Sequence, residues 1–317
     1  MFLASKFLTR ANHATVEEIM LGAIAGDIIG SIYERHNTTR YDFELFTNHS
    51  TFTDDTVMTV AMMDHILSRA DLADTIRKWY SRYPRKGYGP GFRAWIGGHA
   101  KGMSRGNGAA MRTSPGAWLP YPWEEMIENV VRCARVTHDS PDGVAGSRAV
   151  AITIRHLRDG FGAKYVRNTV EGTADGYERL RWPPKIKQPG GLARESVPVA
   201  LAAALNSKNF EDAIRKAVSV GGDSDTIASI AGAVAEAIYG RLPDEILYEI
   251  RDRLPSDLMN VVDDFYYNWV DPDIAYPRTH RKGNESVSGL QMAPPYDPIY
   301  RRGFAFGIIG GKRKGGF

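Results

Sequence analysis

The chain of 317 residues contains a single cysteine, Cys133, and this scarcity restricts its chemistry. One cysteine excludes an intramolecular disulfide and a zinc site built from several thiolates. It fits a reducing compartment, so we expect a cytoplasmic protein. The sequence also lacks an apolar run of the ~18 residues that a membrane span requires. We therefore expect a protein that is not embedded in a membrane.

An excess of basic charge is almost absent as well, because 40 Lys and Arg stand against 37 Asp and Glu, for a net charge of +3. Residues 278–317 hold eight of the basic residues and two of the acidic ones, which leaves −3 on residues 1–277. Nucleic-acid binding needs a clustered basic surface, so it is not expected outside this basic end. Residues 274–317 are rich in Pro, Gly and Arg without periodicity and are predicted to be a disordered tail.

Alternating apolar and polar residues, the pattern of strands, are scarce too. Apolar residues recur instead at helical spacing, which predicts an all-α compact single domain over residues 20–273, after an N-terminal extension of residues 1–19. Residues 86–116 are dense in glycine, which is typical of a flexible connector or of a backbone cradle for a ligand, and composition does not separate the two. Helices are predicted at Val16–Tyr33, Asp55–Arg69, Ala70–Tyr83, Trp123–Val136, Gly143–Leu157, Glu195–Leu205, Phe210–Val218, Asp225–Tyr239, Glu245–Leu254 and Asp257–Trp269.

Two similar acidic clusters precede predicted helices: Thr53-Asp54-Asp55-Thr56 and Asp223-Ser224-Asp225-Thr226. Either one alone would be read as a helix cap, because Asp, Ser and Thr are preferred at that position. Two clusters together bring four carboxylates, which repel one another unless cations neutralise them. Ligands that are all oxygen favour Mg²⁺, Mn²⁺ or Ca²⁺. Two such ions would orient a substrate and activate a water molecule.

Five motifs in a fixed order carry a resemblance that extends over about residues 21–269. They are Gly22-Ala23-Ile24-Ala25-Gly26-Asp27 with Gly30-Ser31-Ile32-Tyr33-Glu34, Phe52-Thr53-Asp54-Asp55-Thr56, Gly106-Asn107-Gly108-Ala109-Ala110-Met111-Arg112, Thr137-His138, and Gly221-Gly222-Asp223-Ser224-Asp225-Thr226. With these motifs the chain resembles the ADP-ribosylglycohydrolase family. The resemblance implies an orthogonal helical bundle with two Mg²⁺ or Mn²⁺ ions. It also implies a hydrolase that cleaves the N- or O-glycosidic bond at C1″ of ADP-ribose and releases ADP-ribose from a modified protein or small molecule. We expect the protein to be a monomer.

The resemblance assigns roles to individual residues. It implies metal binding by Thr53, Asp54, Asp55, Asp223, Asp225 and Thr226. It implies catalytic roles for Glu34, Asp54 and Asp55, although the carboxylate that acts as general base stays open. It implies substrate contacts through a backbone cradle and one imidazole: Gly106, Asn107, Gly108, Ala109, Ala110, Met111 and His138.

Other interpretations stay open. The same fold serves without catalysis in some lens crystallins, so a silent ADP-ribose-binding or structural protein is the alternative, although both acidic clusters are intact here. Without the family, Glu34 would be read as an exposed acid at a helix end. Asp27 is interpreted as a buried polar anchor rather than a metal ligand, because it lies far from both clusters in sequence. The group attached to ADP-ribose is also open: arginine, serine, a nucleic-acid base, an acetyl ester or a small molecule.

Overall fold

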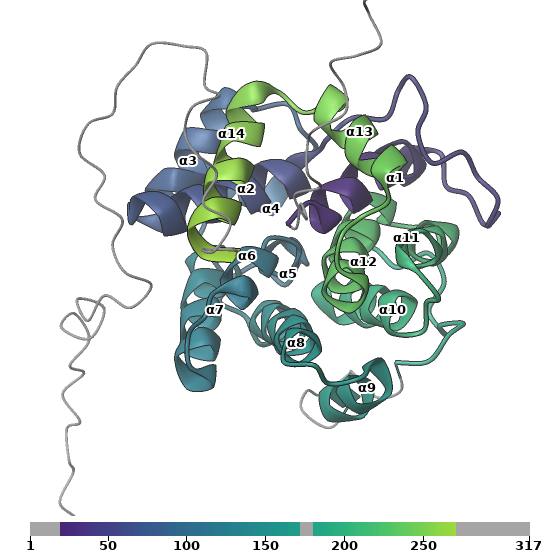
Figure 1. Cartoon of the computed structure of the whole chain (residues 1–317). Coiled ribbons are helices and arrows are strands. Elements are labelled where there is room, and N and C mark those ends of the chain that lie inside the picture. Colours follow the sequence, from purple (N-terminus) through teal and green to yellow (C-terminus); the bar gives the residue numbers. More distant parts are fainter. Residues whose placement is uncertain (1–19, 172–179, 271–317) are drawn as a thin grey trace, which may run out of the picture. The chain divides into compact units, whose positions relative to one another are not determined.

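The structure, a computed structural model, describes residues 20–171 and 180–270. Within these ranges the chain forms helices and two isolated bridges but no β-strand (Figure 1). The predicted all-α fold is confirmed. Residues 1–19 and the tail from residue 274 lie outside the described residues, as does the predicted start of the first helix at Val16. No helix of the described ranges is long and apolar enough to span a membrane.

Ten helices match predicted segments, with ends that differ by a few residues. They are α1 (Gly22–Arg35), α2 (Asp54–Ser68), α3 (Leu72–Arg82), α7 (Trp123–His138), α8 (Pro141–Arg158), α10 (Ala193–Leu205), α11 (Phe210–Ser219), α12 (Ser224–Tyr239), α13 (Asp244–Arg253) and α14 (Ser256–Phe265). The last predicted helix is divided, because a π-helical turn, η1 (Tyr266–Val270), follows α14.

Four helices were not predicted. Three begin in the glycine-rich stretch, and Pro residues occupy first-turn positions in two of them, where a missing N–H costs no hydrogen bond. The glycines around these helices interrupt the helical spacing of apolar residues on which a helix prediction depends. They are α4 (Pro90–Ile96), α5 (Gly108–Met111), α6 (Ser114–Trp118) and α9 (Ala163–Glu171).

Helices α1 and α12 pack antiparallel with their backbones in close approach. Gly22 faces Gly232, whereas Gly30 faces the backbone of Asp225. A Cβ atom on Gly26 would lie 1.9 Å from the carbonyl oxygen of Ala228, so only glycine fits this crossing. The small residues in α1 therefore serve helix packing. Their packing brings the end of α1 beside the start of α12.

The start of α2 is held against the middle of α1 by one buried carboxylate. Asp27 Oδ2 accepts hydrogen bonds from the backbone N–H groups of Thr53 (2.9 Å) and Thr56 (3.0 Å). Its Oδ1 accepts from the Thr53 hydroxyl at 2.7 Å, and the Thr56 hydroxyl also donates to Oδ2. Because Asp27 is fully buried, these bonds offset its desolvation. The first turns of α2 and α12 consequently both lie next to α1.

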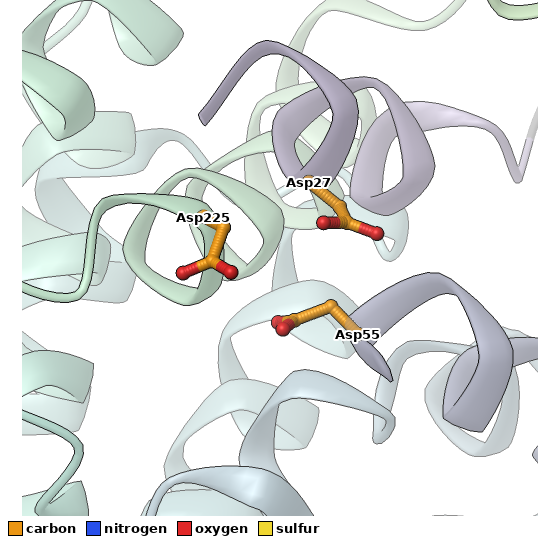
Figure 2. A group of neighbouring side chains, drawn as sticks. All are labelled: Asp27, Asp55 and Asp225. Carbon is orange, nitrogen blue, oxygen red and sulfur yellow. The ribbon is translucent and has the colours of Figure 1, made fainter. Parts of the chain in front are cut away.

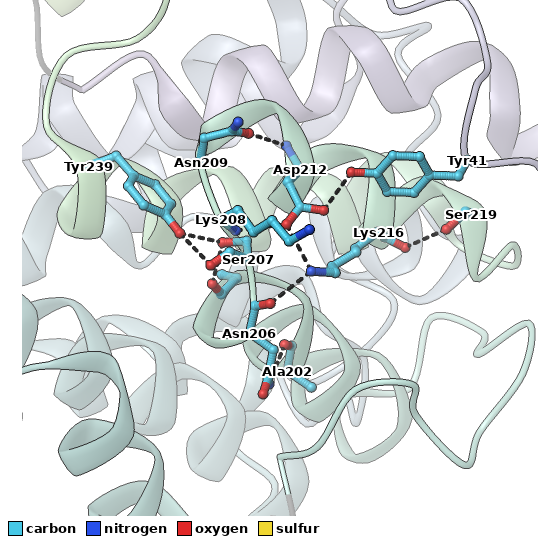
Figure 3. Close-up of polar contacts among 11 residues, drawn as sticks. Tyr41, Ala202, Asn206, Ser207, Lys208, Asn209, Asp212, Lys216, Ser219 and Tyr239 are labelled. Carbon is cyan, nitrogen blue, oxygen red and sulfur yellow. Dashed lines mark hydrogen bonds and ion pairs between the residues drawn. The ribbon is translucent and has the colours of Figure 1, made fainter.

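The segment between α1 and α2 is fastened to α11 by Asp212 (Figure 3). The hydroxyl of Tyr41 donates to Asp212 Oδ1 at 2.5 Å, and Lys216 Nζ donates to Oδ2 at 2.8 Å. Burial and the Asp212 carboxylate raise the pKa of Tyr41 to about 12, which keeps its hydroxyl protonated as a donor. Arg215 adds a bond from Nη1 to the carbonyl oxygen of Phe43 at 2.7 Å.

Candidate functional site

Three helices place carboxylates around one point (Figure 2). Asp27 of α1, Asp55 of α2 and Asp225 of α12 have carboxylate oxygens within 4.8 Å of one another. Glu34, Asp223 and Asp225 form a second group of the same size. Asp225 belongs to both groups. The two acidic clusters, about 170 residues apart in the sequence, therefore form a single site.

Helix capping explains few of the carboxylates in these two groups. At the start of α2 the hydroxyl of Thr53 is the group that accepts a hydrogen bond from the Asp55 N–H. At the start of α12 Asp223 occupies the capping position without a capping hydrogen bond from its side chain. The carboxylates of Asp54 and Asp55 are therefore not needed as caps, whereas Asp225 Oδ1 accepts from the first-turn N–H of Thr226 at 2.8 Å.

The two clusters also contact each other directly. The hydroxyl of Thr226 donates to Asp55 Oδ2 at 3.1 Å. The other oxygen, Asp55 Oδ1, is buried and has no hydrogen-bond partner among the described residues. A buried carboxylate oxygen without a partner is costly, and a divalent cation is a fitting partner for it.

The pKa values at the site reflect burial and mutual repulsion. Burial, with repulsion from Asp27, raises the pKa of Asp54 to about 8. Burial and the neighbouring carboxylates raise the pKa of Asp55 and of Asp225 well above the usual range. Glu34 is exposed over much of its surface, but its partial burial and repulsion from Asp223 raise its pKa. Carboxylates packed in this way must take up protons or bind cations.

Asp27 is the buried anchor that the sequence predicts, but its distance along the chain is a poor guide to its position. Its carboxylate belongs to the first acidic group, because the close packing of α1 on α12 carries it there. Both its oxygens already accept hydrogen bonds from Thr53 and Thr56. Asp27 consequently orients the start of α2 from within the site.

The glycine loop at Gly106–Met111 lies beside the second acidic cluster, because Asn107 connects the two. Asn107 Nδ2 donates to Asp223 Oδ2 at 2.6 Å and to Ser196 Oγ at 3.0 Å. The backbone N–H of Asn107 donates to the carbonyl oxygen of Gly191 at 2.9 Å. Asn107, predicted to contact substrate, thus has its donors engaged within the protein.

The remaining backbone N–H groups of the loop differ in availability. The N–H of Gly106 donates to Ser104 Oγ at 3.1 Å, and that of Met111 donates to the carbonyl oxygen of Asn107 at 3.0 Å. Those that begin α5 have no hydrogen-bond partner among the described residues. The N–H groups that a bound anion could use are those of Gly108, Ala109 and Ala110.

His138, the last residue of α7, packs against this loop. A Cβ atom on Gly108 would come within 3.0 Å of His138 Nε2, so the imidazole occupies the space that a side chain at residue 108 would need. Gly108, which the family resemblance assigns to the ligand cradle, thus also lies in tight contact with the ring of His138. Burial and the charge of Arg112 lower the pKa of His138 to about 3, so the ring is neutral.

Sequence reasoning gave no role to two residues that hold these groups in place. Arg112 is fully buried behind the loop, and Ser196 of α10 accepts from Asn107. Arg112 ends one of the quoted motifs, which is a signal for importance but not for burial. Nothing in the sequence points to Ser196, because its contact with Asn107 is made by residues far apart in the chain.

Comparisons with known proteins identify the family of this chain. Residues 9–273 match the ADP-ribosylglycohydrolase family. ADP-ribosylhydrolase ARH3 of Homo sapiens is 27% identical over 306 residues, with 70% of this chain and 84% of that protein covered. ADP-ribosylarginine hydrolase Tri1 of Pseudomonas putida is 26% identical over 267 residues, with 70% and 69% covered.

A solved structure supports the fold separately. A chain of an ADP-ribosylglycohydrolase-related protein complex superposes with a TM-score of 0.64 at 24% identity, covering 78% of this chain and 94% of that one. The family match also contains all residues of the two acidic groups and of the glycine loop. The chain therefore belongs to the ADP-ribosylglycohydrolase family of hydrolases.

Proposed function

We propose that this chain is a metal-dependent hydrolase that cleaves the N- or O-glycosidic bond at C1″ of ADP-ribose and releases ADP-ribose from a modified protein or small molecule. The observation that carries the proposal is the convergence of five carboxylates in two groups that share Asp225. The relatives named as ADP-ribosylhydrolases support it.

The chemistry of the donors fits hard divalent cations. All candidate ligands offer oxygen, and the buried Asp55 Oδ1 lacks another partner among the described residues. Mg²⁺ or Mn²⁺ suits such a set, and two groups with a common member suit two ions. Bound there, they would fix the ribose hydroxyls and polarise a water molecule. The proposed ligands are Thr53, Asp54, Asp55, Asp223, Asp225 and Thr226.

The chain's own residues supply the remaining requirements of a glycosyl transfer. Departure from C1″ passes through an oxocarbenium-like state that a nearby carboxylate stabilises. Glu34 and Asp54 are the proposed proton acceptors, because both are less buried than Asp55 and burial raises the pKa of each. The N–H groups of Gly108–Ala110 would donate to the diphosphate, next to His138.

The alternative remains a silent binding or structural protein of the same fold. The intact acidic groups favour the enzyme, since the buried Asp55 Oδ1 has no hydrogen-bond partner among the described residues, and an unpaired buried oxygen is a cost without a structural use. We further propose that the protein acts as a monomer. Its location would be cytoplasmic, given the single cysteine. We do not propose nucleic acid as a partner of the folded domain. Only the basic residues 274–317 could offer it a binding surface. The group attached to ADP-ribose is left open.

A panel of ADP-ribosylated substrates, assayed with Mg²⁺ and with Mn²⁺, tests the proposal. The double variant Asp54→Ala/Asp55→Ala should lose release of ADP-ribose while its helical circular dichroism is retained. Asp74→Ala, an exposed acid of α3, is the matched control and should keep full turnover. Turnover in the double variant, or full activity of the unaltered protein in excess chelator, would overturn the proposal. Binding of ADP-ribose without turnover of any substrate would favour the silent protein.

A further inference from the structure

A buried hydrogen-bonded chain runs from the glycine loop to His138. Arg112, which directly follows α5, donates from Nη2 to the hydroxyl oxygen of Thr137 at 2.7 Å. The same hydroxyl lies 2.7 Å from His138 Nδ1. All three side chains are nearly or fully buried, with exposed fractions of 2%, 3% and 5%. Neither Arg112 nor Thr137 has a part in the proposed chemistry.

The direction of each hydrogen bond follows from a count of hydrogens. A guanidinium only donates, so the Thr137 oxygen accepts from Arg112. The hydroxyl has one hydrogen, and His138 Nδ1 is its other partner among the described residues. If Nδ1 carried a hydrogen and donated it, the hydroxyl hydrogen of Thr137 would be buried without an acceptor, at a cost of about 1–3 kcal/mol. The favoured arrangement is therefore Arg112 to Thr137 to Nδ1.

An imidazole that accepts at Nδ1 and is neutral carries its hydrogen on Nε2. Nε2 faces the loop, because it lies 3.6 Å from the place of a Cβ on Gly106 and 3.0 Å from that of a Cβ on Gly108. It has no hydrogen-bond partner among the described residues. The ring therefore presents a free donor at the loop.

We propose that Arg112 and Thr137 are positioning residues that hold His138 as the neutral Nε2–H tautomer, so that it donates a hydrogen bond to a diphosphate oxygen bound at the Gly106–Met111 loop. The ligand part rests on the proposed function, whereas the tautomer does not. Because the guanidinium of Arg112 can donate but cannot accept, it sets the direction of the hydrogen bonds that run through Thr137 to His138. Thr137 transmits that direction through its single hydrogen.

The test compares Thr137→Ser, which keeps the hydroxyl, with Thr137→Val, which keeps the shape and removes it. The first readout is a long-range proton–nitrogen NMR spectrum of the imidazole, with His138→Gln used for assignment. We expect the Nε2–H tautomer in the unaltered protein and in Thr137→Ser. Thr137→Val should show a mixture of tautomers or a protonated ring. Circular dichroism should be the same for all three proteins.

The second readout is the affinity for ADP-ribose by calorimetry. Thr137→Val should bind about tenfold more weakly, the usual effect of one misdirected hydrogen bond to a charged group, whereas Thr137→Ser should bind as the unaltered protein does. An Nδ1–H tautomer in the unaltered protein, or an unchanged tautomer in Thr137→Val, would overturn the inference. Absence of ADP-ribose binding with the Nε2–H tautomer present would instead overturn the ligand part together with the proposed function.

Discussion

Asn107 donates a hydrogen bond of 2.6 Å to the carboxylate of Asp223, and this contact joins the glycine loop to the acidic site. Its second acceptor, Ser196 on α10, fixes the amide plane. One oxygen of Asp223 is thereby oriented before any ligand arrives. The loop and the acidic groups therefore keep a fixed relative position, which the proposed reaction at a ribose attached to a diphosphate requires.

Asn107→Ala should lower kcat/KM by about 10- to 100-fold, because Asp223 loses its orienting donor and the loop loses its tie to the site. Steady-state kinetics at saturating Mg²⁺ measure the effect. Asn168→Ala, at an exposed position of α9, is the control and should leave kinetics unchanged. Unchanged kinetics in Asn107→Ala would show that the contact does not serve the reaction.

Asp225→Asn should have opposite effects with and without metal. In chelator the variant should be at least as stable as the unaltered protein, because one buried carboxylate is removed from a group that raises the pKa of its neighbours. On addition of Mg²⁺ or Mn²⁺ the unaltered protein should gain several degrees in Tm by ligand stabilisation, and the variant should gain little. Differential scanning fluorimetry measures both. An equal gain in both proteins would place the cations elsewhere.

Gly26→Ala should destabilise the protein by about 3 kcal/mol, since the new methyl group would lie 1.9 Å from the carbonyl oxygen of Ala228 and force α1 away from α12. Gly91→Ala is the matched control within a helix. Nothing lies within 4 Å of a Cβ there, so its stability should be unchanged or slightly higher. Urea denaturation gives both values. A small loss of stability in Gly26→Ala would mean that α1 and α12 can move apart at little cost in free energy.

Glu236 should make stability depend on pH. Its Oε1 accepts from the N–H groups of Met20 and Leu21 at 2.7 and 3.0 Å, and burial raises its pKa from 4.5 to about 8. Between these values the folded protein holds a proton that the unfolded chain has lost. The contribution of Glu236 to the free energy of unfolding is therefore full below about pH 4.5 and is lost as pH rises toward 8. Each unit of difference between the folded and unfolded pKa corresponds to about 1.4 kcal/mol.

Glu236→Gln removes this titration while an amide oxygen remains to accept from the backbone. The fall in Tm between pH 6 and pH 8 should therefore be smaller in the variant than in the unaltered protein. Differential scanning calorimetry at both pH values decides the matter. A parallel fall in the two proteins would show that other groups cause it.

Much of the fold was predictable, because apolar residues at helical spacing mark each long amphipathic helix, as in α7 and α11. Short helices such as α4 and α5 were not, since few turns and many glycines leave no period to detect. The candidate site follows the same division. The acidic clusters are visible as local patterns, but the position of Asp27 among them depends on the packing of α1 on α12.

The sequence by itself determined the family, the helical class and the two acidic clusters that we propose as ligands of divalent cations, because these depend on local pattern and on side-chain chemistry. Only the tertiary structure decided that Asn107 uses its amide on Asp223, that Arg112 is buried behind the loop, and that His138 lies beneath Gly108. These are contacts between residues far apart in the chain. They exist because close packing of helices excludes water and leaves each buried donor to find an acceptor nearby.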